Sequence, residues 1–215
     1  MTQLIDISPP IHPGTSVWPG DVPFSRTVAM SLAAGDSVEL SSIQSTVHIG
    51  AHTDAPSHYV DGPDISARDP ALYFGPCQVI SVEIARSERV LPSHIQAPIR
   101  AARVLLRTRT FPNPDRFNED FAALSVELVH VLAAAGVRLI GIDTPSVDLC
   151  RDSELLAHHA IAEHDLAILE GIVLDEVSDG LYTLIALPLR LAECDASPVR
   201  AMLFTSLTPD PLEAP

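Results

Sequence analysis

Three histidines and an aspartate lie within a run of eleven residues: His48, His52, Asp54 and His58. Neutral imidazole nitrogens and carboxylate oxygens bind divalent metals such as zinc or manganese, and two histidines with one acid form a recurring catalytic ligand set. If the run is extended, side chains at even offsets share one face, so all four point the same way. The alternative is a chance grouping of surface or core histidines, but this density and spacing favour a metal site.

The residues between these side chains fit the same interpretation. Gly50 lies between the first two histidines, and its missing side chain leaves room for an ion. Pro56 is unfavourable inside a helix or a central strand, so we expect the segment to end as a turn that carries His58.

A second group of possible ligands follows about one hundred residues later, in residues 153–171. The first part contains good helix formers, with Ser153 as the predicted N-cap and core contacts predicted for Leu155, Leu156 and Ile161. Adjacent positions on a helix diverge by about 100°, so one metal cannot be reached by every histidine of this segment. Spacing alone does not choose among the three: His158, His159 and His164.

Glu170 closes the apolar stretch 166–169 and precedes Gly171. A carboxylate in this position either reaches solvent or is held at a buried positive charge such as a metal. The sequence leaves both possibilities open.

Composition limits the function classes. The chain has 215 residues, is 47% hydrophobic and carries a formal charge of -15, and every basic side chain is arginine. The absence of lysine excludes a lysine Schiff base, and an acidic chain without a basic stripe argues against nucleic acid or anionic membrane as a partner. No apolar run reaches membrane-spanning length, and no signal peptide is evident, so we expect a cytoplasmic location.

The three cysteines are odd in number and widely spaced, which favours neither a disulfide framework nor a thiolate zinc site: Cys77, Cys150 and Cys194. We expect them to be small buried hydrophobic residues. The sequence also contains no Gly-x-Ser-x-Gly motif, so it gives no support to a serine hydrolase.

The hydrophobic pattern predicts an α/β fold in a single domain spanning residues 1–215, with a mixed sheet and flanking helices. A helix is predicted over 125–135, closed by Gly136. A loop rich in proline and glycine carries Trp18, the only tryptophan, either as a packing residue or as a pocket wall. Strands are predicted over residues 4–7, 38–45, 78–82, 104–108, 137–143, 171–175 and 180–189.

These motifs, taken in order, resemble the bacterial kynurenine formamidases (arylformamidases) of the cyclase-like metal-dependent hydrolase family. The similar stretches span nearly the whole chain: residues 4–8, the Val-Trp-Pro-Gly-Asp loop 17–21, the His-x-Gly-x-His-x-Asp-Ala-Pro run 48–58, the Gly-Ile-Asp-Thr-Pro-Ser stretch 141–148, and residues 157–170. The resemblance implies a compact domain of the swivelling β/β/α type that assembles as a homodimer or larger homo-oligomer.

The resemblance also implies roles for individual residues. One of two divalent metal ions, expected to be zinc although manganese is compatible, would be held by His48, His52 and Asp54. Asp54 and Glu170 would be shared between the ions, and His158 would complete the second site. His58 matches the family's proton donor and acceptor, and Trp18 its wall against the aromatic ring of the substrate.

The implied reaction is hydrolysis of N-formyl-L-kynurenine to L-kynurenine and formate, a step of tryptophan breakdown. Paired divalent ions lower the pKa of a shared water to about 7, and His58 would protonate the leaving arylamine. Two alternatives stay open: a hydrolase of the same family acting on another amide, an ester or a cyclic lactam, and a metal-binding protein without catalysis.

Overall fold

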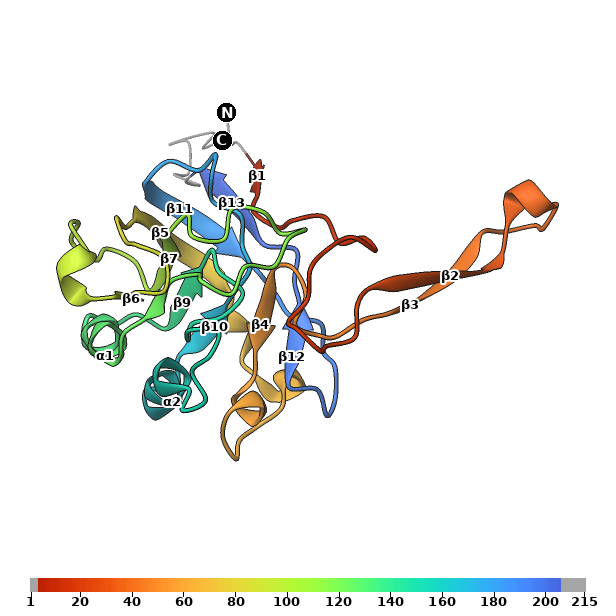
Figure 1. Ribbon diagram of the computed structural model, residues 1–215. Coiled ribbons are helices and arrows are strands. Elements are labelled where there is room, and N and C mark those ends of the chain that lie inside the picture. Colours follow the sequence, from red (N-terminus) through yellow and green to blue (C-terminus); the bar gives the residue numbers. More distant parts are fainter. Residues whose placement is uncertain (1–3, 206–215) are drawn as a thin grey trace.

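The computed structural model describes residues 4–205. Seven strands of this part of the chain form one mixed sheet, which confirms the predicted α/β class (Figure 1). Four neighbouring strands are parallel, and the other three pair antiparallel. In spatial order the strands are β1 (Leu4–Asp6), β13 (Met202–Thr205), β11 (Gly180–Ile185), β5 (Phe74–Ser81), β7 (Arg103–Arg107), β9 (Leu139–Ile142) and β10 (Ala167–Leu169).

Three two-stranded sheets, two helices and five short 3-10 segments complete the described chain. The sheets pair β4 (His52–Asp54) with β12 (Ala196–Pro198), β2 (Ser25–Met30) with β3 (Leu40–Gln44), and β6 (Arg89–Val90) with β8 (Ala123–Leu124). The helices are α1 (Val126–Ala134) and α2 (Leu156–Glu163). The 3-10 segments are η1 (Leu32–Ala34), η2 (Pro56–His58), η3 (Ile65–Ala67), η4 (Pro70–Leu72) and η5 (Pro92–His94).

The large sheet separates two hydrophobic cores, because successive side chains of a strand point to opposite faces. In β7, Val104 and Leu106 join the core on the face that α1 and α2 cover, whereas Leu105 joins the core on the other face. Both helices pack against each other on the same side of the sheet (Figure 1). Burial on both faces explains why these strands read as continuous apolar runs in the sequence.

Helix α1 confirms its prediction. Ser125 is the N-cap, and its side chain accepts a hydrogen bond from the backbone N–H of Leu128. Gly136 follows the helix with a φ of 84°, a left-handed conformation that glycine adopts without strain.

Helix α2 lies near its predicted place, but Ser153 is not its N-cap. The N-cap is Leu155, with a φ of 49°, and the first turn is capped by the distant carboxylate of Asp148. The predicted core contact of Ile161 is confirmed, whereas Leu156 is exposed. Leu155 is half-buried.

Other predictions hold in part. The strand predicted over residues 171–175 is wrong, because Gly171 has a φ of 63° and the N–H groups of Gly171 and Val173 bond to separate segments, at Thr144 and Ile7. The strand predicted over 180–189 ends at Ile185. Cys77 is buried as expected, but Cys150 and Cys194 are only partly covered, and all three thiols are free.

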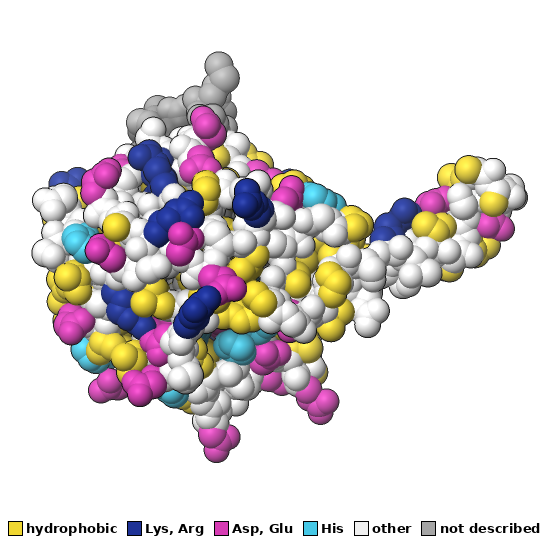
Figure 2. Space-filling view, viewed as in Figure 1, with side chains coloured by type: hydrophobic (Ala, Val, Ile, Leu, Met, Phe, Trp, Pro, Cys, Tyr) yellow, Lys and Arg dark blue, Asp and Glu magenta, His cyan; other side chains and the backbone are white. Residues whose placement is uncertain are grey.

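The hairpin of β2 and β3 projects from the body as an arm (Figure 1). The strand 38–45 was predicted, but its partner β2 was not. The arm exposes several apolar side chains, visible in yellow in Figure 2, and Ile43 is 70% exposed. An isolated two-stranded ribbon is marginally stable in water.

The expected homo-oligomer remains a prediction, as does the cytoplasmic location. Within residues 4–205, no helix has the length and apolar character needed to cross a bilayer.

Two remote segments cross beside the sheet at a pair of glycines. Gly171 follows β10, and a Cβ atom at this position would overlap the carbonyl oxygen of Gly50. The close approach is secured by reciprocal backbone bonds between the residue before Gly171 and the second residue after Gly50: His52 N–H to Glu170 O (3.1 Å) and Glu170 N–H to His52 O (2.9 Å). The histidine run and the residues after β10 are therefore held in fixed register.

We predict that Gly171→Ala is strongly destabilising, since the methyl group both strains a positive φ and forces these segments apart. Gly136→Ala is the matched control, because Gly136 also has a positive φ but has open space around its Cβ direction. Thermal or urea unfolding should show that the free energy of unfolding falls by about 1 kcal/mol in the control and by about 3 kcal/mol or more in Gly171→Ala. Equal losses would show that the crossing tolerates a side chain.

Candidate metal centre

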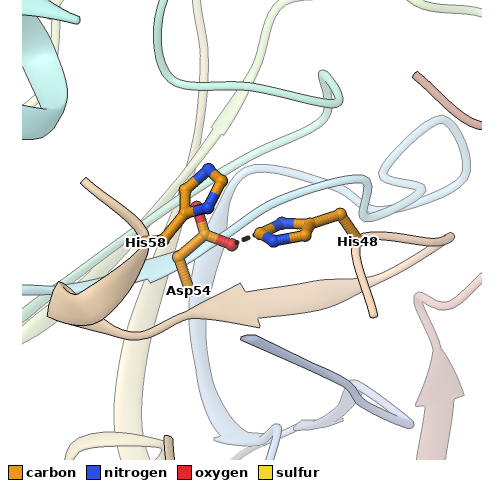
Figure 3. A group of neighbouring side chains, drawn as sticks. All are labelled: His48, Asp54 and His58. Carbon is orange, nitrogen blue, oxygen red and sulfur yellow. Dashed lines mark ion pairs between the residues drawn. The ribbon is translucent and has the colours of Figure 1, made fainter. Parts of the chain in front are cut away.

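Asp54 lies at the centre of the predicted cluster. It ends the short strand β4, whose three residues are all buried, and pairing of β4 with β12 fixes its position. Both carboxylate oxygens are buried without a hydrogen-bond partner. Imidazole nitrogens approach within 3.1 to 3.7 Å, from His48, His52 and His158. Figure 3 shows His48 and His58 beside this carboxylate.

Glu170 supplies a second buried carboxylate, at the carboxyl end of β10. Its Oε2 lies 3.1 Å from Nε2 of His52, and its Oε1 lies 4.0 Å from Nε2 of His158. Oε1 also accepts a hydrogen bond of 2.6 Å from the backbone N–H of Val147, which fixes the orientation of the side chain. Burial excludes the alternative in which Glu170 simply reaches solvent.

The three imidazoles around Asp54 share one arrangement. In each, the ring nitrogen that faces away from Asp54 and Glu170 contacts a hydrogen-bond acceptor on the outer side of the cluster. Nδ1 of His52 lies 3.0 Å from the carbonyl oxygen of Gly50, and Nε2 of His48 lies 3.0 Å from Asp195. Nδ1 of His158 lies 2.8 Å from Asp148. With the proton on the outer nitrogen, the lone pair of the inner nitrogen faces Asp54 and Glu170. Metal-binding histidines are held in this way.

The electrostatics of the cluster favour a positive charge. Burial lowers the pKa of His48 and of His158, but the surrounding carboxylates outweigh it and raise these pKa values to about 9 and about 10. Burial raises the pKa of Asp54, and the attraction of His158 and His48 more than reverses this, so that it falls well below its usual value. The buried carboxylates therefore stabilise positive charge beside them, either on the imidazoles or on a bound cation.

These residues fit a divalent metal. Nε2 of His52 and both oxygens of Asp54 are buried polar atoms without hydrogen bonds, which is costly unless another partner is bound. Among the described residues, three groups have ligand atoms that all lie within 4.8 Å of one another, and one of them is the exposed group His130, Glu163 and His164. Asp54 belongs to the other two: His48, Asp54 and His58, and His52, Asp54 and Glu170. Nitrogen and oxygen donors suit zinc or manganese.

Every predicted ligand is thus brought to one place, and the geometry separates the histidines that spacing could not. His158 is buried and faces both carboxylates, whereas His159 is exposed. His164 lies on the surface, where it contacts His130 at 2.7 Å. The ligand roles themselves remain predictions.

His58 lies at the edge of the cluster, in the 3-10 turn that Pro56 begins, as expected. The ring lies against that of His48, with centroids 4.2 Å apart and the ring planes tilted by 41°, and the His58 side chain is 34% exposed. Nδ1 lies 3.2 Å from Oδ2 of Asp195. Its position is compatible with proton transfer or with metal binding.

Asp195 and Asp148 were not predicted as site residues. Asp195 precedes β12 and contacts both His48 and His58, but no motif around it in the sequence indicates this. Asp148 accepts hydrogen bonds from His158 and from Arg89. A signal for Asp148 did exist, because it lies in the stretch 141–148 that carries the family resemblance.

A cavity of about 520 Å³ opens above the cluster. His48, His52, Asp54, His58, His158 and Glu170 line it together with apolar side chains that include Trp18, Phe111 and Ile172. Trp18 also packs edge-on against Phe117 and Phe121, with ring centroids 5.5 and 6.1 Å apart. The two interpretations of Trp18 are therefore both correct in geometry: it packs against aromatic rings and it forms a cavity wall.

Comparison with known proteins identifies related sequences and structures. The sequence profile described as putative cyclase matches residues 5–149. A potential metal-dependent hydrolase with cyclase activity is 26% identical, with a TM-score of 0.82 over 96% of this chain and 99% of that chain. A protein described as a predicted metal-dependent hydrolase from Bacillus stearothermophilus is 25% identical, with a TM-score of 0.78 over 95% of this chain and 98% of that chain.

Isatin hydrolase A from Ralstonia solanacearum shares the fold at 20% identity, with a TM-score of 0.82 over 95% of this chain and 92% of that chain. The profile match contains the histidine run and Asp148 but ends before His158 and Glu170. The similarity to complete structures extends over the part that the profile leaves out.

We predict that Asp148→Ala lowers the free energy of unfolding by about 3 to 5 kcal/mol at pH 7 in the presence of a chelator, because a buried acceptor of His158 and Arg89 is lost. Burial raises the pKa of Asp148, but its hydrogen bonds, first that from His158, lower it to about 2 from the usual 3.8. A lowered pKa stabilises the fold above the unfolded-state value, so the difference from wild type should shrink as the pH falls from about 4 to about 2.

Urea unfolding at several pH values measures this difference. Glu119→Ala is the control, because its ion pair with Arg151 is exposed and should contribute less than about 1 kcal/mol. A pH-independent loss, or a loss no larger than that of the control, would contradict the role assigned to Asp148.

Proposed function

The chain belongs to the putative cyclase family, and from this premise we propose that it is a metal-dependent hydrolase that converts N-formyl-L-kynurenine to L-kynurenine and formate. The observation that supports hydrolysis is the pair of buried carboxylates, Asp54 and Glu170, faced by inner ring nitrogens of three imidazoles at the floor of a cavity. The aromatic wall of the cavity supports an aryl substrate.

In this proposal His48, His52, Asp54, His158 and Glu170 would hold two divalent ions, zinc by preference, with Asp54 and Glu170 available to both. When bound, such ions polarise an amide carbonyl and lower the pKa of water. The outer contacts of the imidazoles, to Asp195, Gly50 and Asp148, would hold the remaining ring proton on the outer nitrogen when a metal displaces the inner one, and they fix the orientation of each ring.

His58 supplies the proton that the leaving arylamine nitrogen needs. Contact of Nδ1 with Asp195 leaves Nε2 free to exchange a proton, and the carboxylate stabilises the ring while it is charged. Trp18 and its aromatic neighbours exclude water beside the ring of the substrate and orient the formamide toward His58.

Another hydrolase activity of the same family is the second candidate, supported by the fold shared with isatin hydrolase A, whose name indicates a cyclic amide substrate. A non-catalytic metal-binding protein is less consistent with His58, which metal binding by the other five residues does not require.

Elemental analysis of the purified protein and an absorbance assay test the proposal together. We expect about two divalent ions per chain and hydrolysis of N-formyl-L-kynurenine that a chelator abolishes. The same assay is run on three other compounds: isatin, a carboxylic ester and a simple lactam. If one of them is hydrolysed faster than N-formyl-L-kynurenine, the proposed substrate is wrong and that compound's class takes its place. If metal-loaded protein hydrolyses none of the four compounds, the proposal that the protein is a hydrolase is wrong.

We predict that Asp54→Ala abolishes metal binding, because a carboxylate shared by both ions compensates charge on each. Elemental analysis should find no retained ion, and formamide hydrolysis should be lost with it. Asp61→Ala, which removes an exposed acid a few residues later, should leave both unchanged. An Asp54→Ala protein with full occupancy and activity would refute the assignment.

We predict that His58→Ala lowers kcat by about 10²- to 10⁴-fold while metal content stays near that of wild type, since the proton donor is lost but the ligands stay. His159→Ala, next to a proposed ligand but exposed, serves as the control and should keep normal turnover. Loss of metal from His58→Ala would show that His58 is a ligand instead.

We predict that Trp18→Ala raises KM for the aromatic formamide several-fold, because the ring loses part of its apolar wall. Steady-state kinetics should show no such rise for N-methylformamide, which has no ring. A lower melting temperature with an unchanged KM would mean that Trp18 serves packing alone.

A further inference from the structure

Arg109 has a backbone conformation that its side chain disfavours. Its φ is 59°, in the left-handed region that non-glycine residues enter rarely and that is often found at functional sites. The carboxylate of Asp143 holds it there by accepting the backbone N–H groups of Arg109, at 2.8 Å, and of Thr108, at 2.8 and 2.9 Å. The buried Asp143 thus fixes the backbone of Arg109, whereas Arg109 itself is exposed.

Arg109 lines the cavity above the metal centre, and it is the only arginine among the described residues that does so. Its guanidinium has no ion pair or hydrogen bond within residues 4–205, whereas many other arginines of this acidic chain pair with a carboxylate, as Arg89 and Arg107 do. An unpaired cation in the cavity of a protein with a formal charge of -15 is therefore available to an anion from outside.

The sheet places Arg109 and the metal centre at the same edge. Arg109 follows the parallel strand β7, Asp143 follows β9, and Glu170 follows β10. Ligands of α/β sheets bind at the carboxyl ends of parallel strands. Since β9 alone separates β7 from β10, the ends of these two strands lie about 10 Å apart. One elongated ligand can therefore reach both.

We propose that Arg109 binds a carboxylate group of the substrate and makes the enzyme selective for aryl formamides that carry an acid on their side chain. A guanidinium presents two parallel N–H donors to a carboxylate, which gives direction as well as attraction. This inference rests on the proposed function and deepens it by identifying the group that holds the far end of the substrate.

The test compares N-formyl-L-kynurenine with N-formylkynuramine, which differs only in lacking the carboxylate. Wild type should have the higher kcat/KM for the acid. In Arg109→Gln, kcat/KM for the acid should fall about tenfold or more, mainly through KM, and that for the amine should change less than about twofold. Arg116→Gln is the matched control, because it removes an exposed arginine of the following loop that does not line the cavity.

Arg109→Gly separates binding from a structural role. Glycine relieves the positive φ, so the melting temperature should rise by about 2 to 4 °C while selectivity for the acid is lost. Equal loss of activity toward both substrates in Arg109→Gln, or a wild type that does not distinguish them, would overturn the proposal.

If wild type hydrolyses neither compound, the proposed function has failed, and binding still tests Arg109. Calorimetry with metal-loaded protein then compares L-kynurenine with kynuramine. Tighter binding of the acid by wild type, and its loss in Arg109→Gln, would support carboxylate recognition. Equal affinities, or no binding of either compound, would refute it.

Discussion

The carboxylate of Asp54 sets the constraint on which the site depends. It is buried at the end of β4, and the nearest polar groups are the imidazole nitrogens of His48, His52 and His158, at 3.1 to 3.7 Å. A buried anion is tolerated only beside positive charge, and the chain provides imidazoles whose pKa values are raised by that same carboxylate and its acidic neighbours. Arginine, the only permanently charged basic side chain in this sequence, does not reach it within the described residues. Without metal, the buried carboxylates are compensated by protonated imidazoles. Divalent ions would supply the same positive charge, and they would compete with protons for the inner imidazole nitrogens.

The fold serves this constraint by joining parts of the chain that are remote in sequence. Reciprocal backbone bonds between His52 and Glu170 link the histidine run to the end of β10, and pairing with β12 brings Asp195 to the outer side of the same histidines. The parallel strands then place their carboxyl ends around one cavity. Outer hydrogen bonds select the nitrogen that each imidazole presents, so the metal centre is built from backbone register as much as from ligand side chains.

Local chemistry explains what could be predicted from the sequence. The buried parallel strands and α1 have strong apolar patterns with defined caps, and the ligands of the histidine run are close in sequence. The remaining features depend on distant contacts. Asp195 acquires its role only through pairing of β12 with β4, and α2 is capped by Asp148 rather than by Ser153. Residues 171–175 are apolar enough for a strand, but they form an irregular segment that buries Ile172 and Leu174, because Gly171 turns the chain at its crossing with Gly50. The strand β2 is exposed on the arm and has no burial pattern to reveal it.

A crystal structure of the purified protein with anomalous diffraction at the absorption edge of its bound metal tests the central claim most directly. The account predicts anomalous density between the carboxylates of Asp54 and Glu170, with Nδ1 of His48 and Nε2 of His52 and His158 directed at it. Density confined to the surface pair His130 and His164, or a fully loaded protein with no anomalous density at Asp54, would contradict it.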